Sequence, residues 1–382
     1  MILRRPLCLL WLEYSQMPKF VPGLELNKLF YQEEVRPILD RAFPRLRHSA
    51  ALIGWGSEVL GFDTQISRDH YWGPRLLLFL SEKDSPRLKD HISKLLSVEL
   101  PYEFMGYSTH YSKPEPNNVC HPVKITHGPV NHMINIHSVR FYFKARLGFD
   151  LKRRITVADW LTFPQQRLLE LTSGEVYYDG LGQLAKAREK LQYYPRDIWL
   201  YMMAAQWTRI SQEEAFVGRA GHVGDELGSQ IVAARLVREI VKLSFLMERK
   251  YAPYSKWLGT AFSRLMIAKD LAPLLRKAML GKTWKTREKW LSKAYTLIAR
   301  QHNALKITEP LSTKTSDYYS RPYSVIFAER FAKAIKQSIK DPNVQKIATD
   351  IGSIDQFTDS TNVVEDLALI RKLRIAYAEG VR

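Results

Sequence analysis

The second half of the chain consists almost wholly of long segments in which apolar residues recur at helical spacing. Glycine or proline separates these segments, as expected where helices end. Each segment is long enough to form a helix that buries one face against its neighbours, so the pattern predicts a helical bundle. The expected helices are residues 199–216, 228–247, 254–280, 284–305 and 320–339.

Before about residue 150, segments with the apolar pattern of helices alternate with segments typical of strands. The apolar run RLLLFL at residues 75–80 is short and is bounded by turn residues, as expected of a buried strand. Together with the later helices, this mixture places the chain in the α+β class, with a small mixed sheet followed by a helical bundle. The other expected elements are strands at 99–104 and 133–143, and helices at 83–96 and 24–43, the last kinked or divided by Pro37.

A length of 382 residues predicts two domains or one domain with a large insertion. The change of pattern gives four expected parts. They are an N-terminal extension (1–22), an α/β domain (23–150), a helical bundle domain (151–310) and a C-terminal helical segment that packs back on the bundle or on a cleft (311–382).

Composition narrows the class of protein. The formal net charge of +18 favours anionic partners such as nucleotides, nucleic acid or phosphorylated small molecules. Two cysteines cannot make a disulfide framework or a four-thiolate zinc site. No apolar run reaches 18 residues, so we expect no membrane span, and the absence of Asn-x-Ser/Thr favours a cytoplasmic protein.

The most informative segment runs from residue 54 to 80. Gly56 and Ser57 are expected to open a short helix whose free N–H groups hold a phosphate, with Ser57 donating its hydroxyl. Asp69 follows 12 residues later, immediately before the apolar run. This order resembles the signature of the polymerase-beta-type nucleotidyltransferase superfamily. The resemblance implies a strand with Asp-x-Asp, whose carboxylates at i and i+2 hold Mg²⁺ or Mn²⁺ beside a nucleoside triphosphate.

The chain departs from that signature at the second carboxylate, where Tyr71 stands. A neutral phenol is a poor ligand for magnesium, so Tyr71 is a candidate to contact substrate instead. Asp63 could supply a carboxylate from the preceding loop, which leaves Asp69 and Asp63 as candidate metal ligands. The third carboxylate is missing, because Asn135, His137 and Val139 occupy the candidate face of 133–143.

The wider sequence resembles the family of domain of unknown function 4037, which is placed in that superfamily. The resemblance runs from about Met17 to the end. It implies a nucleotidyltransferase-like sheet and a helical C-terminal domain, with Arg75 among the substrate-binding residues. The stretches that carry it are GSEVLGFDTQISRDH, WGPRLLLFL, YYPRDIWLYMMAAQW, RLVREIVKLSFLMERKYAPYSKW and GSIDQFTDST.

A polar cluster interrupts the apolar helix at 199–216. Gln206, Arg209 and Glu213 are spaced i, i+3 and i+7 and therefore share one face. By likeness to the superfamily, Glu213 is the candidate base toward an acceptor hydroxyl, whereas the alternative is an ion-pair network that locks helices. Further candidates for substrate binding are Arg219, Tyr254 and Lys256.

The expected function is transfer of a nucleotidyl group from a nucleoside triphosphate to a hydroxyl of a small molecule. Two alternatives stay open: an acid/base reaction such as glycoside hydrolysis with Asp69 and Glu213 as the pair, and a catalytically inactive nucleotide or RNA binder. Ten Lys or Arg residues with interleaved tryptophans at 269–306 leave RNA open as a partner, although a solvated helix face is the favoured explanation. Asp355 and Asp359 join the site if the C-terminal segment folds back.

Overall fold

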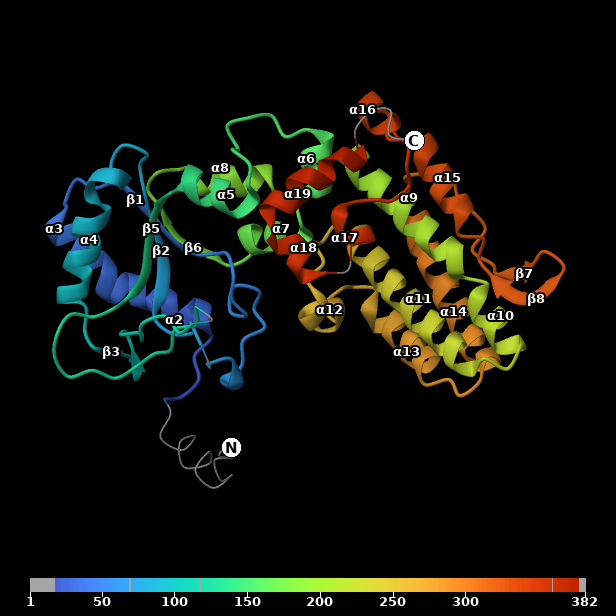
Figure 1. Ribbon diagram of the computed structural model, residues 1–382, viewed down its shortest axis with the longest axis horizontal. Helices are drawn as coiled ribbons and strands as arrows, with labels where there is room; N and C mark the ends of the chain where they lie inside the picture. Colours follow the sequence, from blue (N-terminus) through green and yellow to red (C-terminus); the bar gives the residue numbers. More distant parts are fainter. Residues whose placement is uncertain (1–17, 69, 117, 359, 378–382) are drawn as a thin grey trace, which may run out of the picture. The chain divides into compact units, whose positions relative to one another are not determined.

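The structure is a computed structural model that describes residues 18–68, 70–116, 118–358 and 360–377. It divides into two compact units (Figure 1). The sheet unit comprises Met1–Leu151 and Glu170–Leu191, and the helical unit comprises Lys152–Leu169 and Gln192–Arg382. The predicted α+β class is confirmed, with a mixed sheet preceding a helical bundle.

Four strands form the sheet in the order β5-β2-β1-β6. β5 (Met133–Ser138) is parallel to β2 (Arg75–Leu80), whereas β1 (His48–Leu52) is antiparallel to both β2 and β6 (Glu175–Asp179). Every residue of β2 is buried, which confirms the strand predicted from its continuous apolar run.

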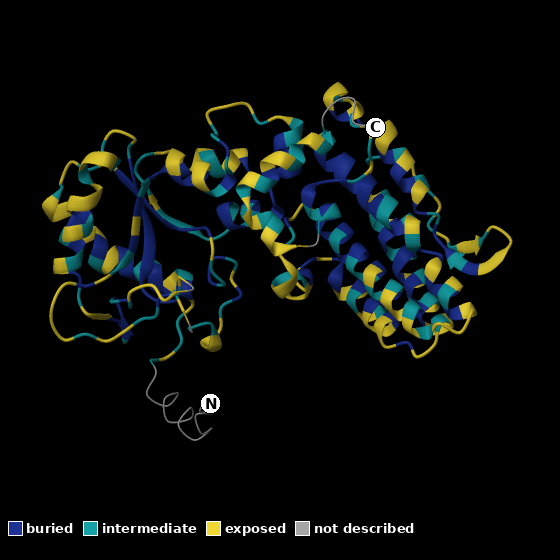
Figure 2. Cartoon of the chain, in the orientation of Figure 1, coloured by how far each residue is buried: buried dark blue, intermediate teal, exposed yellow. Residues whose placement is uncertain are grey.

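Helices cover the sheet and supply its core. The helix predicted at 24–43 is divided into α2 (Gly23–Phe30), a π-helical turn (Tyr31–Val35) and α3 (Arg36–Ala42). Pro37 lies in the first turn of α3, close to one of these divisions. With α4 (Ser85–Glu99) they contribute to a core that includes alternate residues of β2 (Figure 2). The remaining elements are β3 (Glu103–Phe104), β4 (Tyr107–Ser108), α5 (Val139–Leu147) and α8 (Leu184–Lys190).

The prediction of one long strand at 133–143 is wrong. The strand ends at Ser138, whose hydroxyl oxygen accepts a hydrogen bond from the Phe141 N–H and so caps the first turn of α5. Val139 therefore begins a helix and does not lie on the strand face. The strand at 99–104 is also shorter than predicted, because α4 continues through Glu99.

The helical unit is built on α9 (Arg196–Glu213), α11 (Glu226–Met247) and α14 (Trp284–Ala304), with α15 (Glu329–Gln337) packed against α9. Trp207 of α9 stacks on Phe331 of α15 with a ring separation of 4.3 Å. The other elements are α6 (Val157–Thr162), α7 (Gln165–Thr172), α10 (Phe216–His222), α12 (Ser255–Phe262), α13 (Ala268–Met279), β7 (Ser316–Tyr318), β8 (Arg321–Val325), α16 (Pro342–Gln345), α17 (Ile354–Phe357), α18 (Thr361–Glu365), α19 (Leu367–Leu373) and a 3₁₀ turn (Arg374–Tyr377).

Carboxylates that accept N–H groups from a later part of the chain explain two places where a predicted helix is broken. α9 ends at Glu213, because the next side chain, Glu214, turns inward and accepts the N–H groups that precede α15. The helix predicted at 254–280 divides into α12 and α13, since Glu248 accepts the N–H groups of Met266 and Ile267. Both carboxylates act as long-range helix caps, which no local spacing reveals.

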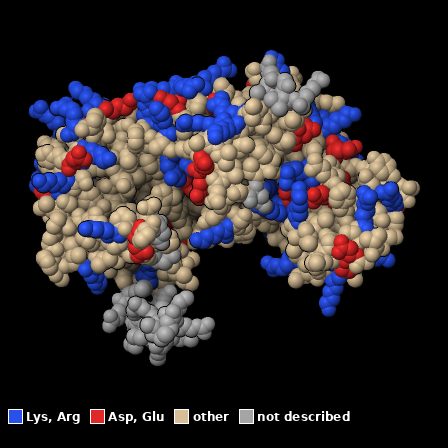
Figure 3. Space-filling view, viewed as in Figure 1, with Lys and Arg blue, Asp and Glu red and all other residues tan. Residues whose placement is uncertain are grey.

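The helix predicted at 320–339 is wrong in its first part. Residues 316–325 form the hairpin β7–β8, in which Tyr323 and Val325 are buried alternately as a strand requires. No described helix is long and apolar enough to cross a membrane. On the face shown in Figure 3, Lys and Arg side chains outnumber Asp and Glu.

Candidate functional site

A pocket in the helical unit brings together polar side chains from several elements. Its volume is about 100 Å³, more than a single buried water needs. α7, α11 and the start of α12 form part of the wall, and the chain around α17 and α18 closes it. The polar side chains among its lining residues are those of Gln165, Gln166, Gln206, Arg238, Lys242, Tyr254, Ser255, Asp355, Gln356, Thr358, Ser360 and Thr361.

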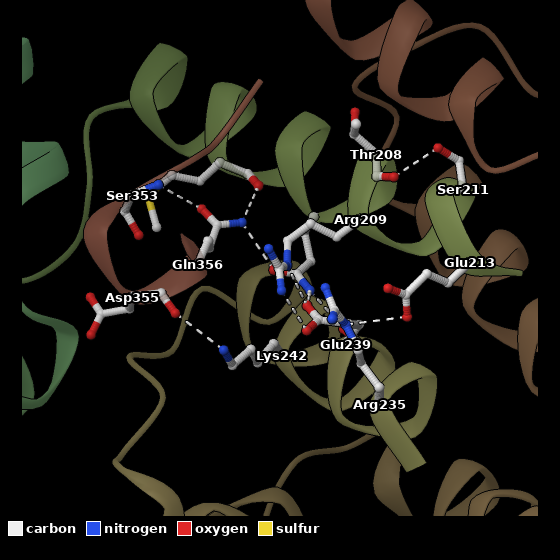
Figure 4. Close-up of polar contacts among 12 residues, drawn as sticks. Thr208, Arg209, Ser211, Glu213, Arg235, Glu239, Lys242, Ser353, Asp355 and Gln356 are labelled. Carbon is white, nitrogen blue, oxygen red and sulfur yellow. Dashed lines mark hydrogen bonds and ion pairs between the residues drawn. The ribbon is translucent and has the colours of Figure 1, made fainter. Parts of the chain in front are cut away.

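A buried hydrogen-bond network supports the pocket floor (Figure 4). The Gln356 amide donates to Gln206 Oε1 at 2.9 Å, and the Gln206 amide donates to Glu239 Oε2 at 2.5 Å. Glu239 also accepts from Arg209 Nε and Nη2, at 2.9 and 3.0 Å. Burial acts to raise the pKa of Glu239, but the hydrogen bonds from Arg209 and the charge of Lys242 more than offset it, so its pKa lies below the usual value. These side chains are satisfied by one another and hold α9, α11 and the C-terminal segment together.

Two ionisable groups of the pocket have perturbed pKa values. Burial raises the pKa of Asp355 to about 6, although the Gln165 N–H, 2.9 Å from Oδ2, and the charge of Lys242 act in the opposite direction. Burial also lowers the pKa of Lys242, whose Nζ donates to the main-chain carbonyl of Asp355 at 3.1 Å. A carboxyl with a pKa near neutrality can accept or donate a proton at physiological pH.

The predicted residues of the helical unit fall into three groups. Gln206 and Tyr254 line the pocket. Arg209 and Glu213 lie on the same face of α9 and pair with α11, Arg209 with Glu239 and Glu213 with Arg235 at 3.2 Å. These contacts are those of the helix-locking network that the sequence left open as the alternative.

Two further predicted residues do not line the pocket. Arg219 lies on α10 over the Phe216 ring, and Lys256 is exposed on α12, 5.0 Å from the Trp257 ring.

In the sheet unit, Gly56 of the turn that was expected to hold a phosphate has a structural role. The short helix predicted at Gly56 and Ser57 is absent, since residues 54–61 form bends and turns. Gly56 has φ +131°, and a Cβ there would lie 2.5 Å from Arg75 Nη2. Arg75 is buried, pairs with Glu58 and stacks over the Trp55 ring at 4.3 Å. The turn thus packs against a buried ion pair, and Ser57 is half-buried beside it.

The predicted metal ligands are only partly placed. Asp69 lies outside the described residues, as does Asp359. Tyr71 precedes β2 by four residues in a left-handed conformation (φ 53°), so it does not occupy a strand position, and its ring lies 4.7 Å from that of Trp55. Asp63 Oδ2 accepts hydrogen bonds from the Gly23 N–H at 2.7 Å and from Trp72 Nε1 at 3.1 Å.

Within the described residues, no three His, Cys, Asp or Glu side chains gather in a way that could hold a metal ion.

Sequence reasoning missed Lys242 and Glu239 as members of the site. The signal was present in α11, where Arg235, Glu239 and Lys242 interrupt an apolar helix at spacings of i, i+4 and i+7, which place them on one face. It also missed Glu58 as the partner of Arg75, because a buried pair 17 residues apart has no local pattern.

Comparison with known proteins adds one assignment. Residues 160–258 match the domain of unknown function DUF4037. The family expected from the sequence is confirmed over this segment. The match contains α9 and α11 and ends within α12, and most residues that line the pocket belong to it. The segment that matches the family therefore supplies most of the pocket lining, and the C-terminal segment around Asp355 supplies the rest.

Whole-chain likenesses are weaker. No curated protein matches the chain in sequence. Among solved structures, a nucleotidyltransferase-like protein from Exiguobacterium sibiricum 255-15 is similar, with 11% identity over 90% of each chain and a TM-score of 0.30. A TM-score of 0.30 is too low for structure or activity to be carried over.

Proposed function

We propose that this chain is a nucleotidyltransferase-like enzyme that holds a small hydroxyl-bearing acceptor in the pocket of the helical unit. The observation that carries the proposal is Asp355, a carboxyl with a pKa of about 6 in a polar pocket built mostly by the DUF4037 segment. A base of that pKa is largely ionised at pH 7 and can still take up a proton as an acceptor hydroxyl attacks.

The reaction proposed is a single displacement at phosphorus. The acceptor oxygen forms a bond to the α-phosphorus of a nucleoside triphosphate, the bond from that phosphorus to the β-bridging oxygen breaks, and pyrophosphate leaves. The proton of the acceptor hydroxyl passes to the Asp355 carboxylate. The ammonium of Lys242 and the guanidinium of Arg238 favour acceptors that carry a negative or strongly polar group.

This function is tested with triphosphates labelled at the α-phosphorus. The full chain is incubated with each of ATP, GTP, CTP and UTP, with Mg²⁺ or Mn²⁺ and an extract of small metabolites. Labelled small molecules and pyrophosphate are expected. Asp355→Asn should lower kcat by at least about 100-fold without changing triphosphate affinity, as removal of a general base does. No triphosphate binding with either metal, or full activity of the variant, would contradict the proposal.

Ser57→Ala supplies the matched control in the sheet unit. If Ser57 donates to a phosphate oxygen, its loss weakens triphosphate binding by about tenfold or more, since a hydrogen bond to a charged group contributes about 1.5–3 kcal/mol. The two variants therefore separate triphosphate binding from proton transfer.

A second candidate is an acid/base reaction without a metal, such as glycoside hydrolysis. Asp63, a candidate metal ligand, already accepts hydrogen bonds at Oδ2 from the Gly23 N–H and from Trp72 Nε1. Because this oxygen is engaged, the observation favours a reaction that needs no metal. Hydrolysis of a chromogenic glycoside that persists in chelator, together with absence of labelled transfer, would place this candidate first.

A further inference from the structure

A group of lysines surrounds one tryptophan on the surface of the helical unit. The Nζ atoms of Lys277, Lys293 and Lys289 lie 4.4, 4.6 and 5.7 Å from the centre of the Trp290 ring. Lys277 belongs to α13 and the others to α14, so two helices contribute to one feature. Lys285 continues the row, 5.7 Å from the Trp284 ring. We call this feature the Lys–Trp face.

The lysines of α14 form a stripe opposite the buried side of the helix. Their spacing is i, i+4 and i+8 from Lys285, and all of them are exposed. The inner side of α14 packs into the bundle through Leu291, Tyr295 and other buried apolar residues. The Lys–Trp face is therefore a fixed outer surface of a well-anchored helix.

The lysines of this face have no carboxylate within ion-pair distance among the described residues. Glu288, the acid of α14, lies on another side, where its carboxylate approaches Gly218. Like charges at i and i+4 destabilise a helix, and the indole offsets this only in part. An anionic partner would relieve the repulsion.

We propose that the Lys–Trp face binds single-stranded nucleic acid, with phosphates at the lysines and a base stacked at Trp290. A row of cations beside an aromatic ring is the arrangement by which single strands are held without sequence preference. The chain's net charge of +18 favours such an encounter. A membrane surface fits less well, because the exposed side of α14 is a lysine stripe and lacks the broad apolar face of an interfacial helix.

The test uses a fluorescein-labelled 12-nucleotide oligouridylate and the full chain, with fluorescence anisotropy read between 50 and 200 mM salt. Four phosphate contacts give a slope of about −2.8 in log K against log salt, so affinity should fall about fiftyfold over this range. The triple variant Lys285→Gln, Lys289→Gln, Lys293→Gln should reduce the slope to about −0.7. Trp290→Leu should weaken binding about fivefold or more with little change in slope.

A control variant with the same loss of charge isolates the face. Lys144→Gln, Lys333→Gln, Lys340→Gln removes three exposed lysines elsewhere and should bind like the wild type. Circular dichroism verifies that each variant is folded. The proposal is overturned if the oligonucleotide does not bind at 50 mM salt, if both triple variants lose affinity equally, or if phosphatidylserine vesicles bind to the face and the oligonucleotide does not.

Discussion

Replacing Asp355 by asparagine should stabilise the protein at neutral pH. Burial raises the pKa of Asp355 from the usual 3.8 to about 6. Because the folded pKa lies above the unfolded one, ionisation opposes folding: the penalty is absent below about pH 3.8 and complete above about pH 6. At about 1.4 kcal/mol for each pH unit, it amounts to about 3 kcal/mol. Asparagine keeps an oxygen to accept the Gln165 N–H and carries no charge.

The measurement is urea unfolding of wild type and Asp355→Asn, followed by circular dichroism at pH 4.5 and 7.5. The advantage of the variant in free energy of unfolding should grow from about 1 kcal/mol at pH 4.5 to about 3 kcal/mol at pH 7.5, with equal urea slopes. Asp317→Asn, in the exposed β7, should show no such growth. An advantage that does not change with pH, or a less stable variant at pH 7.5, would refute the electrostatic reasoning.

Further predictions concern two ion pairs of the helical unit and one glycine of the sheet unit. Arg209→Ala should lower the free energy of unfolding by about 3 kcal/mol or more, since it leaves the carboxylate of Glu239 buried beside fewer donors. Glu213→Gln removes the more exposed pair with Arg235 and should lower the free energy of unfolding by less than about 1 kcal/mol. Urea unfolding measures both changes. Gly56→Ala should destabilise the sheet unit by about 1–3 kcal/mol, and by more than Gly128→Ala. Both glycines have a positive φ, but only at Gly56 would an added Cβ lie against other side chains. Thermal unfolding compares the two variants.

The sequence predicted the class of the fold and most of its long helices, because apolar periodicity is a local property. It failed where the deciding contact is distant. The hairpin β7–β8 and the start of α15 depend on Glu214, more than 100 residues away. The change from strand to helix at Ser138 depends on one hydroxyl cap, which a continuous apolar pattern conceals.

The candidate site was predicted in part. Gln206 and Tyr254 were identified and line the pocket, and Asp355 was expected to join a site if the C-terminal segment folded back, which it does onto α9. Lys242 could not be ranked above other lysines, since its pKa is lowered by burial, which arises from the tertiary structure and has no local pattern in the sequence. Arg75 looked like a substrate ligand because its partner, Glu58, has no local signature.

The pH dependence of nucleotidyl transfer tests the central claim most directly. With the labelled triphosphate and its acceptor at saturation, kcat of the wild type should rise with pH through an inflection near 6, where Asp355 loses its proton, and then level off. In Asp355→Asn the residual rate should lack this inflection. A wild-type profile that is flat between pH 5 and 7.5, or an unchanged inflection in the variant, would contradict the assignment of Asp355 as the base.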